Sequence, residues 1–145
     1  LDADSMQVLA DALRGNYSLH SLNLSGVALD AVGMQALADV LKKNHSLHSL
    51  DLSGARLRDT ASVQALADAL KVNSGLQSLY LSITPLSSNA VQALVFALRE
   101  NKTLHSLVLS HDFSRNSSSV RLKIIGAMSN AVAARILILE SREGV

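Results

Sequence analysis

One eight-residue phrase recurs four times along this chain at an almost constant spacing. It reads LHSLNLSG at 19–26, LHSLDLSG at 47–54, LQSLYLSI at 76–83 and LHSLVLSH at 104–111, so successive copies begin 28, 29 and 28 residues apart. A fixed period of this length is typical of proteins built by stacking one supersecondary unit many times. The sequence therefore predicts a repeat architecture.

Each phrase is predicted to be a short strand. Leucine holds its first, fourth and sixth places, which gives a brief alternation of apolar and variable residues. Because successive side chains of a strand point to opposite faces, Leu22 and Leu24 should face a core while Asn23 faces outward.

The segments between the phrases are predicted to be amphipathic helices of about three turns. Their apolar residues recur at helical intervals, as in Met34, Leu37 and Leu41. Polar residues that favour helix starts precede these runs, and the sequence suggests Thr60, Ser88 or Asn89, and the aspartates of LDAD at the start of the chain as caps.

An asparagine follows each helical run by three residues, at Asn16, Asn44, Asn73 and Asn101. Asparagine tolerates the left-handed backbone conformation that often ends a helix. We therefore expect these four residues to stop the helices in that conformation.

Stacking buries the leucine rows that one unit alone cannot bury. We expect an α/β leucine-rich-repeat solenoid, a curved right-handed β-α superhelix. Its parallel sheet should lie on the concave face and its helices on the convex face, because helices are wider than strands.

One domain spanning 1–145 is expected. It divides into a half repeat at 1–18, repeats at 19–46, 47–75 and 76–103, and an irregular terminal repeat at 104–145. Residues 1–18 align letter by letter with 29–46, so the first strand is missing and we expect a fragment of a longer solenoid. In the last unit we expect a polar loop at 110–119, a helix at 119–132 and a strand at 135–140, where ILIL is either covered or paired with another chain.

The repeat resembles the leucine-rich repeats of the ribonuclease-inhibitor type. The pattern L-x-x-L-x-L is followed five residues later by another leucine, at Leu29, Leu57 and Leu86, and then by a helix. Similar repeats occur in the sensor regions of NOD-like receptors, in the Ran GTPase-activating protein, in tropomodulin-like proteins and in several bacterial effectors. The family usually carries Asn or Cys at the ninth place, but this chain has Val27, Ala55, Thr84 and Asp112 there, so the usual ladder of buried side chains should be missing.

Composition argues against several classes of partner. Thirteen Lys and Arg against twelve Asp and Glu give a net charge of +1, without the basic cluster that nucleic-acid binding needs. The apolar run at 136–139 is too short to cross a membrane. The chain has no cysteine, which removes disulfides and thiolate metal sites and favours an intracellular, cytoplasmic location.

The variable letters of the phrase are the candidate partner-binding residues, because they should stand on the concave sheet. The second place supplies one column and the fifth place another, and together they comprise His20, His48, Gln77, His105, Asn23, Asp51, Tyr80 and Val108. A serine column lies at the third place and includes Ser21. No metal or other cofactor is expected, because Gln77 interrupts the histidine column. Catalysis by Ser21, His48 and Asp51 is not expected, because an open surface lacks an enclosed pocket and oxyanion donors.

Three functions remain open. The leading hypothesis is a protein–protein interaction module, the recognition or scaffold part of a larger protein, which binds a macromolecule on the concave sheet. The first alternative is a self-associating structural solenoid whose exposed ends stack on copies of themselves. The second is the targeting arm of a bacterial effector or GTPase regulator whose activity lies outside this segment. Inhibition of ribonuclease itself is not expected, because the surface is close to neutral.

Overall fold

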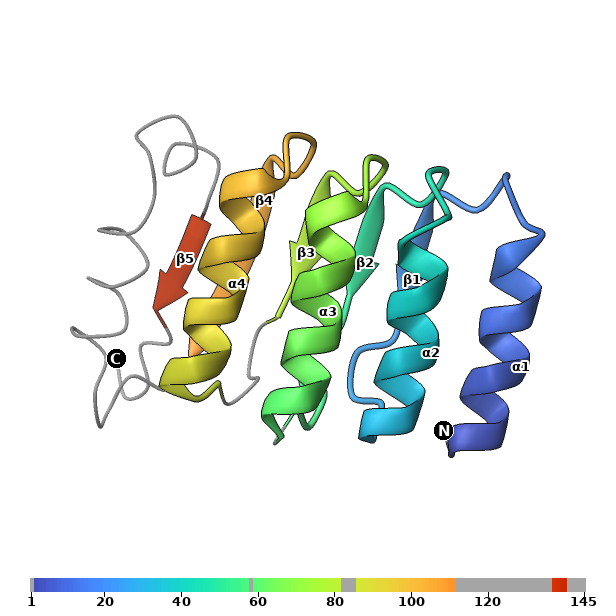
Figure 1. The fold of residues 1–145 in the computed structure, drawn as a ribbon, viewed down its shortest axis with the longest axis horizontal. Helices are drawn as coiled ribbons and strands as arrows, with labels where there is room; N and C mark the ends of the chain where they lie inside the picture. Colours follow the sequence, from blue (N-terminus) through green and yellow to red (C-terminus); the bar gives the residue numbers. More distant parts are fainter. Residues whose placement is uncertain (1, 58, 82–85, 112–136, 141–145) are drawn as a thin grey trace.

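The computed structural model describes residues 2–57, 59–81, 86–111 and 137–140 (Figure 1). Helices and strands alternate as the repeat predicts. In chain order they are α1 (Ala3–Arg14), β1 (Ser21–Asn23), α2 (Ala31–Leu41), β2 (Ser49–Asp51), α3 (Thr60–Val72), β3 (Ser78–Tyr80), α4 (Ser88–Glu100), β4 (Ser106–His111) and β5 (Leu137–Glu140).

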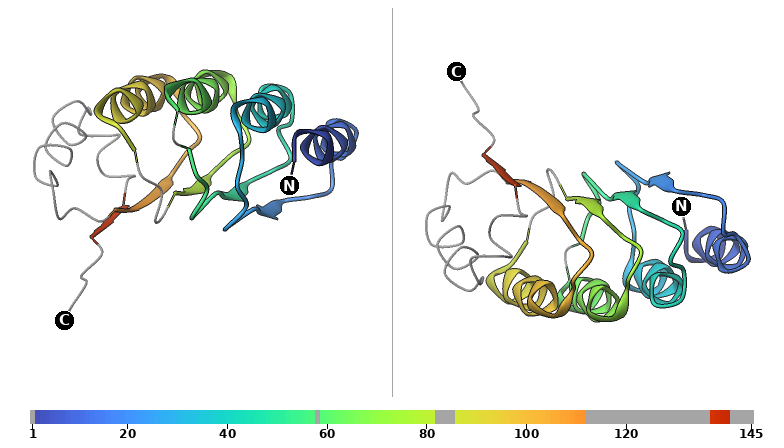
Figure 2. Two further views of the ribbon diagram at one scale, coloured as in Figure 1. Left: turned by 90° about the horizontal axis from the view of Figure 1, so that it is seen from below. Right: turned by 90° about the horizontal axis from the view of Figure 1, so that it is seen from above.

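The strands form one parallel sheet in sequence order, β1-β2-β3-β4-β5. Equivalent places of the repeat lie side by side, since Leu22 pairs with Leu50, Leu50 with Leu79 and Leu79 with Leu107. Figure 2 shows α1 to α4 as a row on one side of this sheet. The predicted α/β class and parallel sheet are therefore confirmed.

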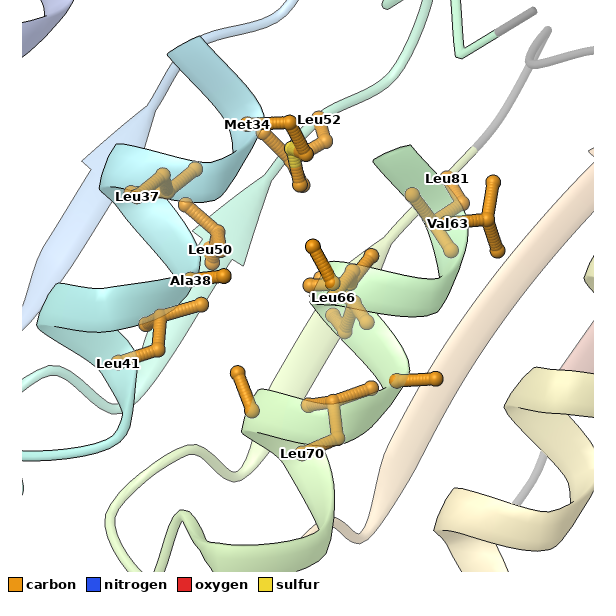
Figure 3. Packing of buried hydrophobic residues seen from close by; sticks show 14 of the residues in the cluster. Met34, Leu37, Ala38, Leu41, Leu50, Leu52, Val63, Leu66, Leu70 and Leu81 are labelled. Atoms are coloured by element: carbon orange, nitrogen blue, oxygen red, sulfur yellow. The ribbon is translucent and has the colours of Figure 1, made fainter. Parts of the chain in front are cut away.

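Leucines from the strands and apolar residues from the helices share one core. Leu50 and Leu79 have no exposed surface, and Met34, Leu37 and Leu41 of α2 are equally buried. Figure 3 shows the α2 side chains beside Leu50 of β2. Since removal of apolar surface from water is the main stabilising contribution, this shared core holds the units together.

The helices begin at cap residues whose side chains accept a hydrogen bond from an amide three positions on. These caps are Asp2, Asp30, Asp59 and Ser87. The predicted cap within LDAD is confirmed at Asp2. The predicted cap Thr60 is wrong by one residue, and the predicted cap Ser88 or Asn89 is wrong by one or two. In both helices the side chain just before the first helical residue, Asp59 or Ser87, already accepts the bond.

Asn73 and Asn101 are not left-handed, so the prediction is wrong at the ends of α3 and α4. Asn73 has φ −70° and ψ 132°, and Asn101 has φ −74° and ψ 129°. The reason lies in their side chains. Asn73 Oδ1 accepts bonds from the amides of Gly75 at 3.0 Å and Leu76 at 2.8 Å, which shape the loop into the next strand.

The side-chain nitrogen of these asparagines links one repeat unit to the preceding unit. Asn73 Nδ2 donates to the carbonyl oxygens of Leu41 at 2.7 Å and Asn44 at 3.2 Å, and Asn44 and Asn101 make equivalent bonds. All three side chains are buried. This chain thus has a buried asparagine ladder in its helix-to-strand loops.

At the ninth place, where the sequence predicts no polar ladder, Ala55 is fully buried and Val27 is half-buried. The turn amides find backbone partners instead: Val27 N donates to Leu24 O and Ala55 N donates to Leu52 O. Gly26 and Gly54 supply the positive φ angles of 75° and 74° that these turns require. Thr84 and Asp112 lie outside the described residues.

In the last unit, the predicted strand at 135–140 is confirmed over residues 137–140 as β5, which pairs in parallel with β4, and residues 135 and 136 lie outside the described residues. The predicted polar loop begins too early, because β4 continues through residues 110 and 111. The predicted helix at 119–132 lies outside the described residues. Within the described part of the chain, no helix has the length and apolar character needed to span a bilayer.

Candidate functional site

The sheet has a face that none of the described helices covers (Figure 2). We call it the open sheet face and define it by the third and fifth places of the four phrases. It comprises Ser21, Asn23, Ser49, Asp51, Ser78, Tyr80, Ser106 and Val108. The leucines between these residues point into the core. The residues of the open sheet face can therefore vary in sequence at little cost to folding.

The fifth-place residues form a continuous row across four strands. Asn23 pairs in register with Asp51, Asp51 with Tyr80, and Tyr80 with Val108. Asn23 is exposed, while Asp51 and Tyr80 are half-buried. The structure therefore brings the predicted fifth-place residues together.

Val108 is the exception to the predicted contact set, because only 7% of it is exposed. It lies on an inner strand, in register with Tyr80 of β3 and Leu137 of β5. A short side chain between two neighbouring strands offers little surface, so direct contact of Val108 with a partner stays a prediction.

The second-place residues run along the starts of the strands. His20, Gln77 and His105 are exposed and His48 is half-buried. The backbone joins them in order: His48 N donates to His20 O, Gln77 N to His48 O and His105 N to Gln77 O, each at 2.8 Å. This row borders the open sheet face.

The rings of His20 and His48 stack in parallel, with centroids 5.0 Å apart and an angle of 3° between their planes. His20 Nδ1 lies 3.0 Å from the carbonyl oxygen of Ser46. Since a carbonyl can only accept, Nδ1 carries the proton. A metal ion bound by two imidazoles lies in both ring planes at about 2.0–2.1 Å from each nitrogen, so parallel rings at this separation do not share one. Among the described residues, no cluster of three or more ligating side chains could hold a metal.

Asn23 and Asp51 also hold the turns that follow their strands. Asn23 Oδ1 accepts a bond from Ser25 N, and Asp51 Oδ1 accepts one from Ser53 N, both at 2.8 Å. Sequence reasoning missed this role, although Asn or Asp two residues before a Ser-Gly turn is a known signal for it. This bond directs Asp51 Oδ1 toward its own turn and not toward the His48 ring, which a catalytic carboxylate would have to orient.

A second regular surface lies on the helices, and the sequence analysis missed it. On α1, α2 and α3, a glutamine donates to an aspartate four residues on, and that aspartate pairs with an arginine or lysine three residues further along. The aspartates are Asp11, Asp39 and Asp68. On α4 the equivalent residue is Phe96, which is 49% exposed and has the Arg99 guanidinium 5.5 Å from its ring centroid.

No protein-family model matches the chain. No curated protein matches it either. Sequence comparison therefore does not assign the chain to a family.

Solved structures do resemble it. The actin-binding site 2 of leiomodin-1 aligns with a TM-score of 0.75 at 18% identity, covering 97% of this chain and 79% of that chain. The tropomodulin C-terminal domain of Caenorhabditis elegans aligns with a TM-score of 0.69 at 16% identity, covering 99% of this chain and 86% of that one. At these identities the likeness establishes the fold alone.

These neighbours correct the expected resemblance to the ribonuclease-inhibitor type, which is wrong. The similar structures are domains of tropomodulin and leiomodin. The chain also departs from that type at the ninth place of the first two phrases, where Val27 and Ala55 replace the usual Asn or Cys, and its buried asparagine ladder lies in the helix-to-strand loops.

Proposed function

We propose that the chain is a protein-binding module whose docking surface is the open sheet face. The observation that carries this proposal is the division of the fold: all described helices cover one side of the sheet, and variable polar and aromatic side chains occupy the other. A broad, open row of side chains suits a macromolecular partner better than a small molecule, which needs an enclosing pocket.

The stacked units support a further part of the proposal, that the chain is a stretch of leucine-rich-repeat solenoid. Each unit contributes one strand and one helix, and neighbouring units pair in a constant register. Such a stack extends a binding face without changing its core. No catalytic role is proposed for these residues, because the proposed contact surface has no oriented base beside a nucleophile.

Actin is the partner that we propose to test first. The leiomodin-1 structure similar to this chain is an actin-binding site, and it aligns over nearly all of the chain. An intracellular location is part of the same proposal, since actin is a cytoskeletal protein.

The experiment compares binding of purified actin to the chain and to two charge-adding variants. Gln77→Arg places a long cation at an exposed second-place residue, next in sequence to Ser78 of the open sheet face, whereas Gln64→Arg places the same group on the exposed surface of α3. We expect Gln77→Arg to weaken binding at least tenfold and Gln64→Arg to leave it within twofold.

Absence of actin binding to the unaltered chain would overturn actin as the partner. Equal binding by both variants would overturn the open sheet face as the docking surface. Circular dichroism of each variant confirms that the fold is retained, so that loss of binding is not loss of structure.

Self-association is the second candidate, and the flank of α1 is the observation that favours it. Val8 is 70% exposed and Ala12 is also exposed, whereas the equivalent Ala36 and Val40 of α2 are buried. A second copy stacked on this flank would cover both apolar side chains. Light scattering over a range of concentrations tests it: a mass that rises with concentration would support self-association, and a constant mass would count against it. The role of targeting arm for an activity elsewhere stays a prediction.

A further inference from the structure

Asp51 is the one formally charged residue on the open sheet face, within the described strands and with histidine counted as neutral. The other residues of the face are serines, asparagine, tyrosine and valine. The described ion pairs all lie on the helices, at Asp11, Asp39 and Asp68. Asp51 therefore gives this face a local negative potential that no described ion pair neutralises.

Tyr80 lies directly beside this carboxylate. Asp51 and Tyr80 are partners in the β2–β3 register, and neighbouring strands are about 4.8 Å apart. Both side chains are half-buried, so their conformational freedom is already restricted before a ligand binds, and binding costs less entropy. The Asp51 side chain is further held by the bond from Ser53 N to its Oδ1.

We propose that Asp51 and Tyr80 form an anchor for a basic side chain of the protein partner, arginine in particular. A carboxylate next to an aromatic ring offers a guanidinium an ion pair and a stacking surface together. Arginine suits such a site better than lysine because its planar fork can pair and stack at once. This inference rests on the proposed function, since it names the chemistry by which the open sheet face would select its partner.

The chain itself contains tolerated replacements for both residues. Asn23 occupies the place of Asp51 in the preceding unit and makes the same bond to its turn, so Asp51→Asn should remove the charge and keep the turn. Val108 occupies the place of Tyr80 in the next unit, so Tyr80→Val should remove the ring and keep the strand. These two variants therefore probe the anchor and leave the fold intact.

The probe is N-acetyl-arginine amide, with N-acetyl-citrulline amide as its uncharged analogue of nearly the same shape. Nuclear magnetic resonance titrations of the chain follow the backbone amides of β2 and β3. We expect saturable shifts at residues 51 and 80 with the arginine compound and at least tenfold weaker binding of the citrulline compound.

The variants sharpen the expectation. Asp51→Asn should weaken arginine binding about tenfold and Tyr80→Val about threefold, while Gln64→Ala, on the exposed surface of α3, should leave it unchanged. Equal binding of the two compounds, or arginine binding that survives Asp51→Asn, would overturn the anchor. Chemical-shift changes centred on Asp11, Asp39 and Asp68 of the helices would also overturn the anchor.

This test separates the anchor from the proposed function. Arginine binding without actin binding would support the anchor and remove actin as the partner. Actin binding that Gln77→Arg abolishes but Asp51→Asn leaves within twofold would support the docking face and overturn the anchor.

Discussion

Replacement of Asn73 by alanine should be among the most destabilising single changes in this protein. Its buried side chain makes four hydrogen bonds. Two go from Nδ2 to the carbonyls of Leu41 and Asn44, at 2.7 and 3.2 Å, and two come to Oδ1 from the amides of Gly75 and Leu76, at 3.0 and 2.8 Å. Alanine removes every one of these bonds and leaves backbone groups buried without partners.

The size of the loss follows from those contacts. A typical hydrogen bond contributes about 1 kcal/mol net, and a buried group left unsatisfied costs about 1–3 kcal/mol. With some relief from water that enters the loop, we expect Asn73→Ala to lower the free energy of unfolding by about 3–5 kcal/mol. Urea denaturation followed by circular dichroism measures it.

Asn16 provides the matched control. Its Oδ1 accepts bonds from the amides of Ser18 and Leu19, as in the later units, but no described residue accepts a bond from its amide nitrogen. It is also only half-buried. Asn16→Ala should therefore cost about 1–2 kcal/mol. A loss below about 1 kcal/mol for Asn73→Ala, or equal losses for both variants, would refute the ladder as the link between units.

Two further changes test the packing and the caps. Gly75→Ala would place a Cβ 2.3 Å from His45 O and should cost about 2–4 kcal/mol of stability, measured by urea denaturation. As the control, Gly15→Ala meets no atom within 4 Å and should change stability by less than about 1 kcal/mol. Similar losses of stability for the two variants would contradict the close approach of Gly75 to His45. The hydrogen bond from the Ser62 amide lowers the pKa of Asp59 below its usual value of 3.8. The stability that this bond contributes to the folded protein is fully present above the unfolded pKa of about 3.9 and is lost as the pH falls through the folded pKa. The difference in free energy of unfolding between the unaltered protein and Asp59→Asn should therefore decrease from about pH 5 to about pH 3 in urea titrations. A difference that stays constant over this range would contradict the role of Asp59 as the helix cap.

The parallel sheet and its register were predictable because they depend on a pattern that repeats. Leucines at fixed places in each phrase specify which side of the strand faces the core, and the nearly constant period specifies that equivalent leucines meet. Leu50 and Leu79 are accordingly both fully buried.

The asparagine ladder was not predictable in the same way. Local reasoning considers one helix end at a time and favours a left-handed asparagine, but the side chain of Asn73 reaches carbonyls 29 and 32 residues earlier in the chain. Such a bond exists only once the units have stacked. Tertiary contacts thus overrode a local preference.

The candidate site was predictable in position and only partly in chemistry. The alternating pattern placed Asp51 and Tyr80 together on one face, and the structure pairs them. It could not show that Val108 would be covered between two neighbouring strands, or that His20 and His48 would stack. Those outcomes depend on side-chain size and neighbours across strands.

Hydrogen–deuterium exchange of the chain with and without saturating actin would locate the docking surface directly. We expect slower amide exchange in the strands and in the turns that follow them, with exchange in α1 to α4 unchanged. Protection confined to the helices, or none at all, would contradict the claim that this protein binds its partner through the uncovered side of its sheet.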